Sequence, residues 1–139
     1  MTGPLVVDAG PLVVLLAENA RIRPWVTAQF RRLKPPFLTC EAVLTEAAFL
    51  LKRHGADPDL LFAMMERGAL KVDFTLGDHR ADVRELMRRY QDTPMSLADA
   101  CLVRMAEIHQ GSTVFTLNSD FLVYRKHGRQ VIPVLMPLS

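Results

Sequence analysis

The stretch Leu5-Val6-Val7-Asp8-Ala9-Gly10-Pro11 decides the fold of this chain. Three consecutive apolar residues, two of them valine, are typical of a strand buried on both faces, as in a parallel sheet covered by helices. Gly10 and Pro11 end the strand, and proline is favoured at the first positions of a helix. The stretch predicts a central strand, then a helix over 11–17. Asp8 then lies at the carboxyl edge of the sheet, where open α/β sheets bind ligands.

Outside this stretch, short apolar strands alternate with helices, which predicts one domain over residues 1–139. The expected fold class is α/β, a three-layer α/β/α sandwich with a mainly parallel central sheet. Thr39 is expected to cap one helix and Gly55 to end it, while Pro133 favours an edge position for the last strand. The expected strands cover 37–38, 70–74, 113–117 and 131–135, and the expected further helices cover 21–33, 39–54, 58–67, 78–90 and 96–109.

Composition narrows the class of protein. The chain has 139 residues, 50% of them hydrophobic, enough for a well-buried core. Its apolar runs are shorter than the roughly 18 residues of a membrane span, and its first residues lack the basic region of a signal peptide. We therefore expect a cytoplasmic protein that does not enter a membrane, with Cys40 and Cys101 as reduced core residues. Its formal net charge of +2 permits a phosphate-rich partner without requiring one.

Glu46 is the least expected of the acidic residues. Its neighbours at three and four residues along a helix are Ala42, Val43, Phe49 and Leu50. A carboxylate on such an apolar face is costly unless it is paired or bound to a metal. The alternative is a partly exposed glutamate at the edge of that face.

Asp8, Asp99 and Asp120 follow strands or begin a helix. Each has a local alternative, which is a helix cap for Asp8, a capping box with Ser96 for Asp99, and an Asx-type turn for Asp120. In a doubly wound sheet these positions and Glu46 converge on one edge. Crowded carboxylates raise each other's pKa, and a hard cation such as Mg²⁺ or Mn²⁺ relieves the repulsion. Metals held in this way promote the hydrolysis of phosphodiesters.

Each of the four acids lies in a short segment of the sequence, and the four segments can be considered together. They are VVDAGPL (6–12), AVLTEA (42–47), YQDTPMSLADA (90–100) and VFTLNSDF (114–121). In their order and spacing they resemble the PIN domain, and in particular the VapC-type toxins of bacterial and archaeal toxin–antitoxin pairs. The resemblance covers nearly the whole chain.

The resemblance implies a Mg²⁺- or Mn²⁺-dependent endoribonuclease whose acidic quartet is Asp8, Glu46, Asp99 and Asp120. Asp8 and Asp99 would be the firmest metal ligands, while Glu46 would complete the site or orient the attacking water. Asp120 would hold a second metal. The implied partners are an RNA substrate, a cognate antitoxin that covers the acidic site, and a second copy of the chain in a homodimer.

The chain departs from many relatives at three positions. Gly10 stands where they carry a hydroxyl residue, Ser96 where close relatives have an acid, and Asn118 where they often have aspartate. A degenerate PIN domain that binds RNA or a protein without cleavage is therefore one alternative. A receiver-like signalling module is another, disfavoured because Asp8 has no adjacent acid and the strand over 113–117 is followed by Asn118 instead of lysine.

Two kinds of surface are candidates for contacts with partners. Two basic clusters offer phosphate contacts, and the apolar helices over 42–51 and 60–65 offer a groove in which Met64 and Met65 would adapt to a partner. Solvated helix ends and ordinary core are the respective alternatives. The basic clusters are Arg31, Arg32 and Lys34, and Arg125, Lys126 and Arg129.

Overall fold

Strands and helices alternate along the chain. The computed structural model describes residues 3–17 and 20–137. Among these residues the elements in chain order are β1 (Leu5–Val7), α1 (Ala9–Ala17), α2 (Arg23–Arg32), β2 (Phe37–Thr39), α3 (Glu41–Arg53), α4 (Asp59–Glu66), β3 (Leu70–Val72), the 3₁₀ helix η1 (Leu76–His79), α5 (Arg80–Arg89), α6 (Leu97–Ile108), β4 (Thr113–Phe115), the 3₁₀ helix η2 (Ser119–Leu122), β5 (Arg125–Lys126), β6 (Gln130–Val131) and β7 (Val134–Leu135).

Strand β1 lies at the centre of a five-stranded sheet with the order β3-β2-β1-β4-β7. Every neighbouring pair in this sheet is parallel. The register pairs Val6 with Leu38 of β2, and Val7 with Phe115 of β4. Val6 and Val7 are fully buried, as expected for a strand covered on both faces. The predicted central parallel strand is confirmed.

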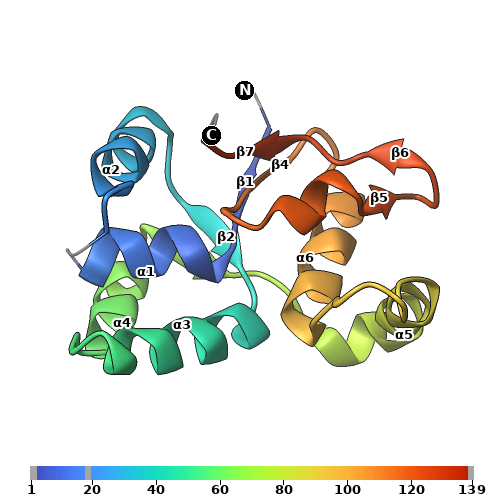
Figure 1. Ribbon diagram of the computed structural model, residues 1–139, viewed down its shortest axis with the longest axis horizontal. Helices are drawn as coiled ribbons and strands as arrows, with labels where there is room; N and C mark the ends of the chain where they lie inside the picture. Colours follow the sequence, from blue (N-terminus) through green and yellow to red (C-terminus); the bar gives the residue numbers. More distant parts are fainter. Residues whose placement is uncertain (1–2, 18–19, 138–139) are drawn as a thin grey trace.

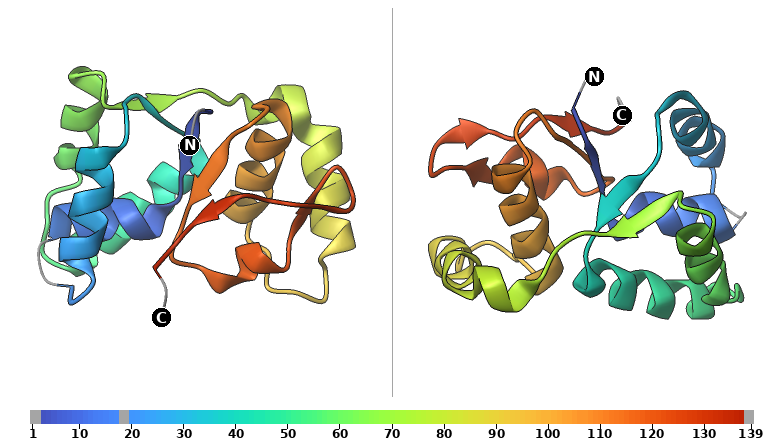
Figure 2. Two further views of the ribbon diagram at one scale, coloured as in Figure 1. Left: turned by 90° about the horizontal axis from the view of Figure 1, so that it is seen from above. Right: turned by 180° about the vertical axis from the view of Figure 1, so that it is seen from behind.

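Helices cover both faces of the sheet and form the predicted α/β/α sandwich (Figure 1). Helices α1 to α4 lie on one side of the sheet, and α5 and α6 lie on the other. Helix α6 packs on β1 and β4, and Ala100, Leu102 and Val103 of this helix have no exposed surface. An antiparallel hairpin of β5 and β6 lies beside α6 (Figure 2).

The helix ends largely follow the expected signals. Gly55 and Gly68 come just after α3 and α4 with φ of 76° and 77°, a conformation that glycine adopts without strain. The prediction that Pro11 begins the first helix is wrong by two residues. Helix α1 begins at Ala9, whose N–H donates to the carboxylate of Asp8.

The prediction that Thr39 caps α3 is also wrong. Thr39 is the last residue of β2, and its hydroxyl donates to the carbonyl of Val7 in β1 at 3.0 Å. Cys40 occupies the N-cap position without a side-chain hydrogen bond to the helix. Because Thr39 is fully buried between two strands, its hydroxyl bonds to the neighbouring strand instead of the helix end.

The C-terminal part differs most from the expected elements. The single strand expected over 131–135 is divided into β6 and β7, which belong to different sheets. Pro133 lies between them and cannot donate a backbone hydrogen bond, and β7 is an edge strand as predicted. A turn was expected over 118–120, and the structure has the 3₁₀ helix η2 from Ser119 to Leu122 instead; the short strand β5 was not predicted.

Two expectations from composition concern the environment of the chain. Within residues 3–17 and 20–137, the helices are too short or too polar to traverse a bilayer. Cys40 and Cys101 are both buried and free, as expected for reduced core residues.

Candidate active site

Asp8 directly follows β1 at the carboxyl edge of the sheet, and only 6% of its surface is exposed. Its Oδ1 accepts the N–H of Ala9 at 2.7 Å, and its Oδ2 accepts the hydroxyl of Thr116 at 2.7 Å. Asp8 therefore bonds both to the start of α1 and to Thr116, the residue that follows β4. With both oxygens anchored, the carboxylate has a defined orientation.

Asp99 lies in the first turn of α6 and is also 6% exposed. The predicted capping box is present: Ser96 Oγ accepts the N–H of Asp99 at 3.0 Å, and Asp99 Oδ2 accepts the N–H of Ser96 at 3.4 Å. The hydroxyl of the buried Tyr124 donates to the same Oδ2 at 2.9 Å. Asp99 Oδ1 accepts no hydrogen bond from the described residues, so this oxygen is available to a ligand.

The two buried carboxylates repel each other. Burial raises the pKa of Asp8 above its ordinary value of 3.8, the hydrogen bonds from Thr116 and Ala9 oppose the rise, and the charge of Asp99 adds to it. Carboxylates held together in this way favour either a proton or a bound cation.

Glu46 lies on α3, whose N-terminal half approaches α6 (Figure 1). The expectation of an apolar, buried face is wrong, because Glu46 and its neighbour Phe49 are both exposed. The alternative of a partly exposed glutamate is correct. The pKa of Glu46 is nevertheless raised, first by partial desolvation and then by the charges of Asp8 and Asp99. Glu46 therefore lies within electrostatic reach of both buried acids.

Asp120 begins η2 and is half-buried. Its N–H donates to the side-chain oxygen of Asn118 at 3.0 Å, so the Asx-type contact in this turn is made by Asn118. The backbone N–H of Tyr124 donates to the carbonyl of Asp120 at 3.1 Å, and the charge of Asp120 adds to the raised pKa of the Tyr124 phenol, after burial and the bond to Asp99. This turn therefore links Asp120 to Tyr124, the residue that bonds to Asp99.

Two residues that hold the acids were missed in the sequence. Thr116 is fully buried, and its oxygen accepts the N–H of Asn118 while its hydroxyl donates to Asp8. The contact of Thr116 with Asp8 depends on the register of β1 and β4, which pairs Val7 with Phe115 and so brings Thr116 beside Asp8; the sequence predicted both strands but carried no signal for this register. The contact of Tyr124 with Asp99 depends on how the segment after η2 packs on α6, and it had no signal in the sequence either.

Comparison with known families identifies the family of this chain. The family model of the PIN domain matches residues 5–126. The chain belongs to the PIN domain family. PIN domains are nucleases that often occur in toxin–antitoxin systems. A search of curated proteins found no match for this chain.

PIN domains generally use divalent metal ions, and hard ions of this kind bind oxygen ligands such as carboxylates. Among the described residues, no three His, Cys, Asp or Glu side chains gather closely enough to hold a metal by themselves. Mg²⁺ is commonly bound by one or two carboxylates, with waters and substrate phosphates as its other ligands. Asp8 and Asp99 offer hard oxygen donors that repel each other. This pair fits a hard cation of that kind.

A hydroxyl group touches Asp8 although this chain lacks the one that many PIN domains carry at the position of Gly10. Here the hydroxyl comes from Thr116. A Cβ at Gly10 would lie 3.3 Å from the side chain of Leu117, which is tighter than most such contacts. The close packing of α1 against the residue after Thr116 therefore favours glycine at this position.

Proposed function

We propose that residues 1–139 form one nuclease domain that acts as a Mg²⁺- or Mn²⁺-dependent endoribonuclease in the cytoplasm. The observation that carries the proposal is the pair Asp8 and Asp99, two buried carboxylates at the carboxyl edge of a parallel sheet. Each has fixed donors on one or both oxygens. Burying two acids without a basic partner is costly, and a cation offsets that cost.

Asp8 and Asp99 would hold the cation, and Thr116, Tyr124 and Ser96 would keep their carboxylates oriented. A bound divalent ion supplies charge neutralisation at the phosphodiester and water of lowered pKa for its hydrolysis. The charges of Asp8 and Asp99 contribute to the raised pKa of Glu46, which is consistent with a position of Glu46 close to the cation site. Glu46 would complete that site or orient the attacking water. Asp120 would provide an oxygen for a second metal when RNA is bound.

The proposed role is that of the toxin in a toxin–antitoxin pair, with the antitoxin as a protein partner. A groove of about 470 Å³ between α3 and α4 supports this partner. Leu44, Ala48 and Met65 line the groove, and Phe62 beside them is 58% exposed. Met65 therefore suits an adaptable surface, whereas Met64 is buried in the core.

A homodimer is the second partnership that we propose. Apolar side chains at the η2 end and on the β5–β6 hairpin support it, because Leu122, Val123 and Val131 are each more than half exposed. Exposed apolar side chains that lie close together often mark a contact between proteins.

The test is cleavage of a structured RNA pool by purified protein with Mn²⁺, with Mg²⁺ and with EDTA. Asp8→Asn should lower the rate by more than the roughly 100-fold typical of changes beside a metal site, because it removes a charged ligand. Asp59→Asn, an exposed acid in the first turn of α4, is the matched control and should cleave normally. Cuts that persist in EDTA or in Asp8→Asn would contradict the proposal.

A degenerate PIN domain that binds RNA or a protein without cleavage is the second candidate. The observation that favours it is Asn118, whose side chain caps the turn and offers no charge where many relatives have aspartate. RNA binding with no cleavage in either metal would support this candidate over the nuclease.

A further inference from the structure

Helix α5 carries its charges on separate faces. Arg80, Arg84 and Arg88 recur at intervals of four residues, so they form one row with a spacing of about 6 Å along the axis. All three are exposed. Met87 and Gln91 lie beside this row. By helical spacing Asp82 is on the opposite side of the helix, and Glu85, three residues before Arg88, lies between the two sides.

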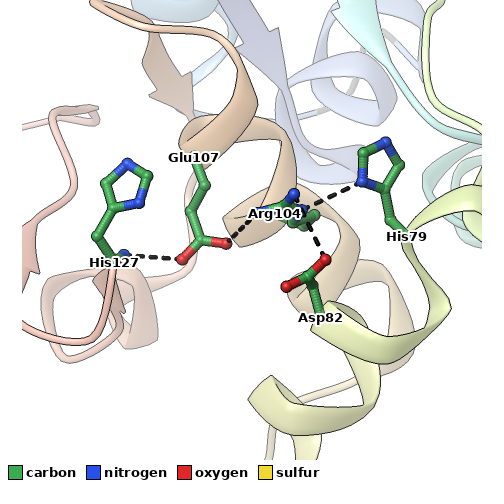
Figure 3. A network of polar contacts seen from close by, with 5 residues as sticks. All are labelled: His79, Asp82, Arg104, Glu107 and His127. Atoms are coloured by element: carbon green, nitrogen blue, oxygen red, sulfur yellow. Dashed lines mark hydrogen bonds and ion pairs between the residues drawn. The ribbon is translucent and has the colours of Figure 1, made fainter.

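The acids of α5 are already paired. Asp82 lies 3.4 Å from Arg104 of α6, and Glu85 lies 3.9 Å from Arg89. Arg104 also bonds to His79 Nδ1 and to Glu107, as Figure 3 shows. The pair between Asp82 and Arg104 joins α5 to α6, whereas the pair between Glu85 and Arg89 lies within α5. The arginine row, in contrast, makes no ion pair within residues 3–17 and 20–137.

A groove of about 420 Å³ runs between the arginine row and the start of α6. Its apolar lining includes Leu76, Met87 and Leu97, which are 36–42% exposed. Leu97 is the first residue of α6, and Asp99 follows two residues later. The groove therefore ends next to the helix turn that carries one of the two buried acids.

We propose that this groove is the track along which a single RNA strand approaches the acids. The proposal rests on the nuclease function above and assigns its substrate a path. The guanidinium groups of Arg80, Arg84 and Arg88 would contact successive phosphates, and the bases would lie against the apolar side chains. Proteins that bind single-stranded nucleic acid combine these two features, a basic groove and a nonpolar surface for bases.

The other basic clusters are less suited to this role. Lys34 lines a pocket with Pro4 and Leu5, at the start of β1 and therefore at the opposite edge of the sheet from Asp8. The guanidinium of Arg125 donates to three backbone carbonyls, those of Leu122, Val123 and Tyr124. In the α5 row Arg80 donates to one carbonyl, that of Gly77. Within the described residues the arginines of the α5 row form no ion pair, and the groove beside them reaches the first turn of α6, the turn that also carries Asp99.

The experiment measures equilibrium binding of a short fluorescent single-stranded RNA in EDTA, where no cleavage occurs, between about 50 and 200 mM salt. The double variant Arg84→Gln/Arg88→Gln should bind about tenfold more weakly, and its slope of log affinity against log salt should be smaller by about 1.4, the value for two phosphate contacts on a single strand. Arg53→Gln/Arg67→Gln removes the same charge from exposed positions on the other side of the sheet. This control should bind nearly as the unchanged protein does.

The outcomes separate the track from the nuclease. In one outcome the unchanged protein cleaves RNA, but the α5 variant binds RNA with the same affinity and the same salt dependence. The RNA track is then wrong and the nuclease function stands, and an acidic protein segment would be the better occupant of the groove. If the α5 variant loses binding but the unchanged protein cleaves nothing, the track stands and the nuclease is wrong. Equal losses in both double variants would overturn the track, because they would show only an effect of net charge.

Discussion

The four candidate acids occupy two regions with different physical characters. Asp8 and Asp99 form a buried floor, where hydrogen bonds from Ala9, Thr116 and Tyr124 hold their oxygens. Glu46 and Asp120 form a rim, one exposed and the other half-buried, and no side chain of the described residues bonds to either carboxylate. The floor is built before any ligand arrives, whereas the rim is free to adjust to a ligand.

This difference separates two tasks that acids perform in a metal-dependent site. A ligand that must not move needs burial and outer donors, since these fix its rotamer and preserve the geometry. A group that orients water or follows a substrate needs freedom, and burial would remove it. The pKa values of Asp8 and Glu46 are both raised. Asp8 and Glu46 therefore differ more in burial and hydrogen bonding than in the direction of their pKa shifts, and the first two differences support their different proposed roles.

The largest expected effect is the difference in cleavage rate between a variant of a floor acid and a variant of a rim acid. Asp99→Asn should reduce metal-dependent cleavage by more than about 100-fold, while Asp120→Asn should reduce it roughly tenfold and recover at high metal concentration. Single-turnover cleavage over a range of Mn²⁺ concentrations measures both. Equal losses in the two variants would remove the distinction between floor and rim.

An intermediate effect is expected for the donor that holds the floor. Thr116→Val removes the hydroxyl bond to Asp8 and the acceptor for the Asn118 N–H, so it should lower the free energy of unfolding by about 1–3 kcal/mol and cleavage by roughly 10–100-fold. The bond lowers the pKa of Asp8, so the acidic limb of the pH–rate profile should move to higher pH.

Thr116→Ser is the control for this change because it keeps the hydroxyl. Its pH–rate profile should match that of the unchanged protein, even if the lost methyl group costs some stability. A profile displaced equally in the valine and serine variants would show that packing, and not the hydrogen bond, governs Asp8.

The smallest effect concerns stability without metal. Because the folded protein raises the pKa of Asp8 above 3.8, the contribution of this group to stability is greatest below that pH and is lost as the pH rises through the folded-state pKa. Asp8→Asn removes the ionisable group, so its stability relative to the unchanged protein should increase as the pH rises from 3.8 through the folded-state pKa of Asp8. Urea unfolding in EDTA measures this, with Asp59→Asn as the control. A difference that stays constant with pH would contradict the raised pKa.

Local pattern predicted the parts of the fold that depend on near neighbours. The run Leu5–Val7, followed by an acid, glycine and proline, was enough to predict a buried central strand with Asp8 at its end. Ser96 and Asp99 predicted their own capping box, because all the atoms involved lie within four residues. Contacts between segments that are far apart in the chain could not be predicted from local pattern. The division of β6 from β7 and the bond from Thr39 to Val7 depend on which strands become neighbours.

The sequence by itself determined the alternation of strands and helices and the positions of Asp8 and Asp99, one directly after a strand and the other in the first turn of a helix. Only the tertiary structure decided that Asp8 and Asp99 are buried and held while Glu46 is exposed. The reason is that burial depends on what packs against a side chain, and Thr116 and Tyr124 reach the acids from 108 and 25 residues away along the chain.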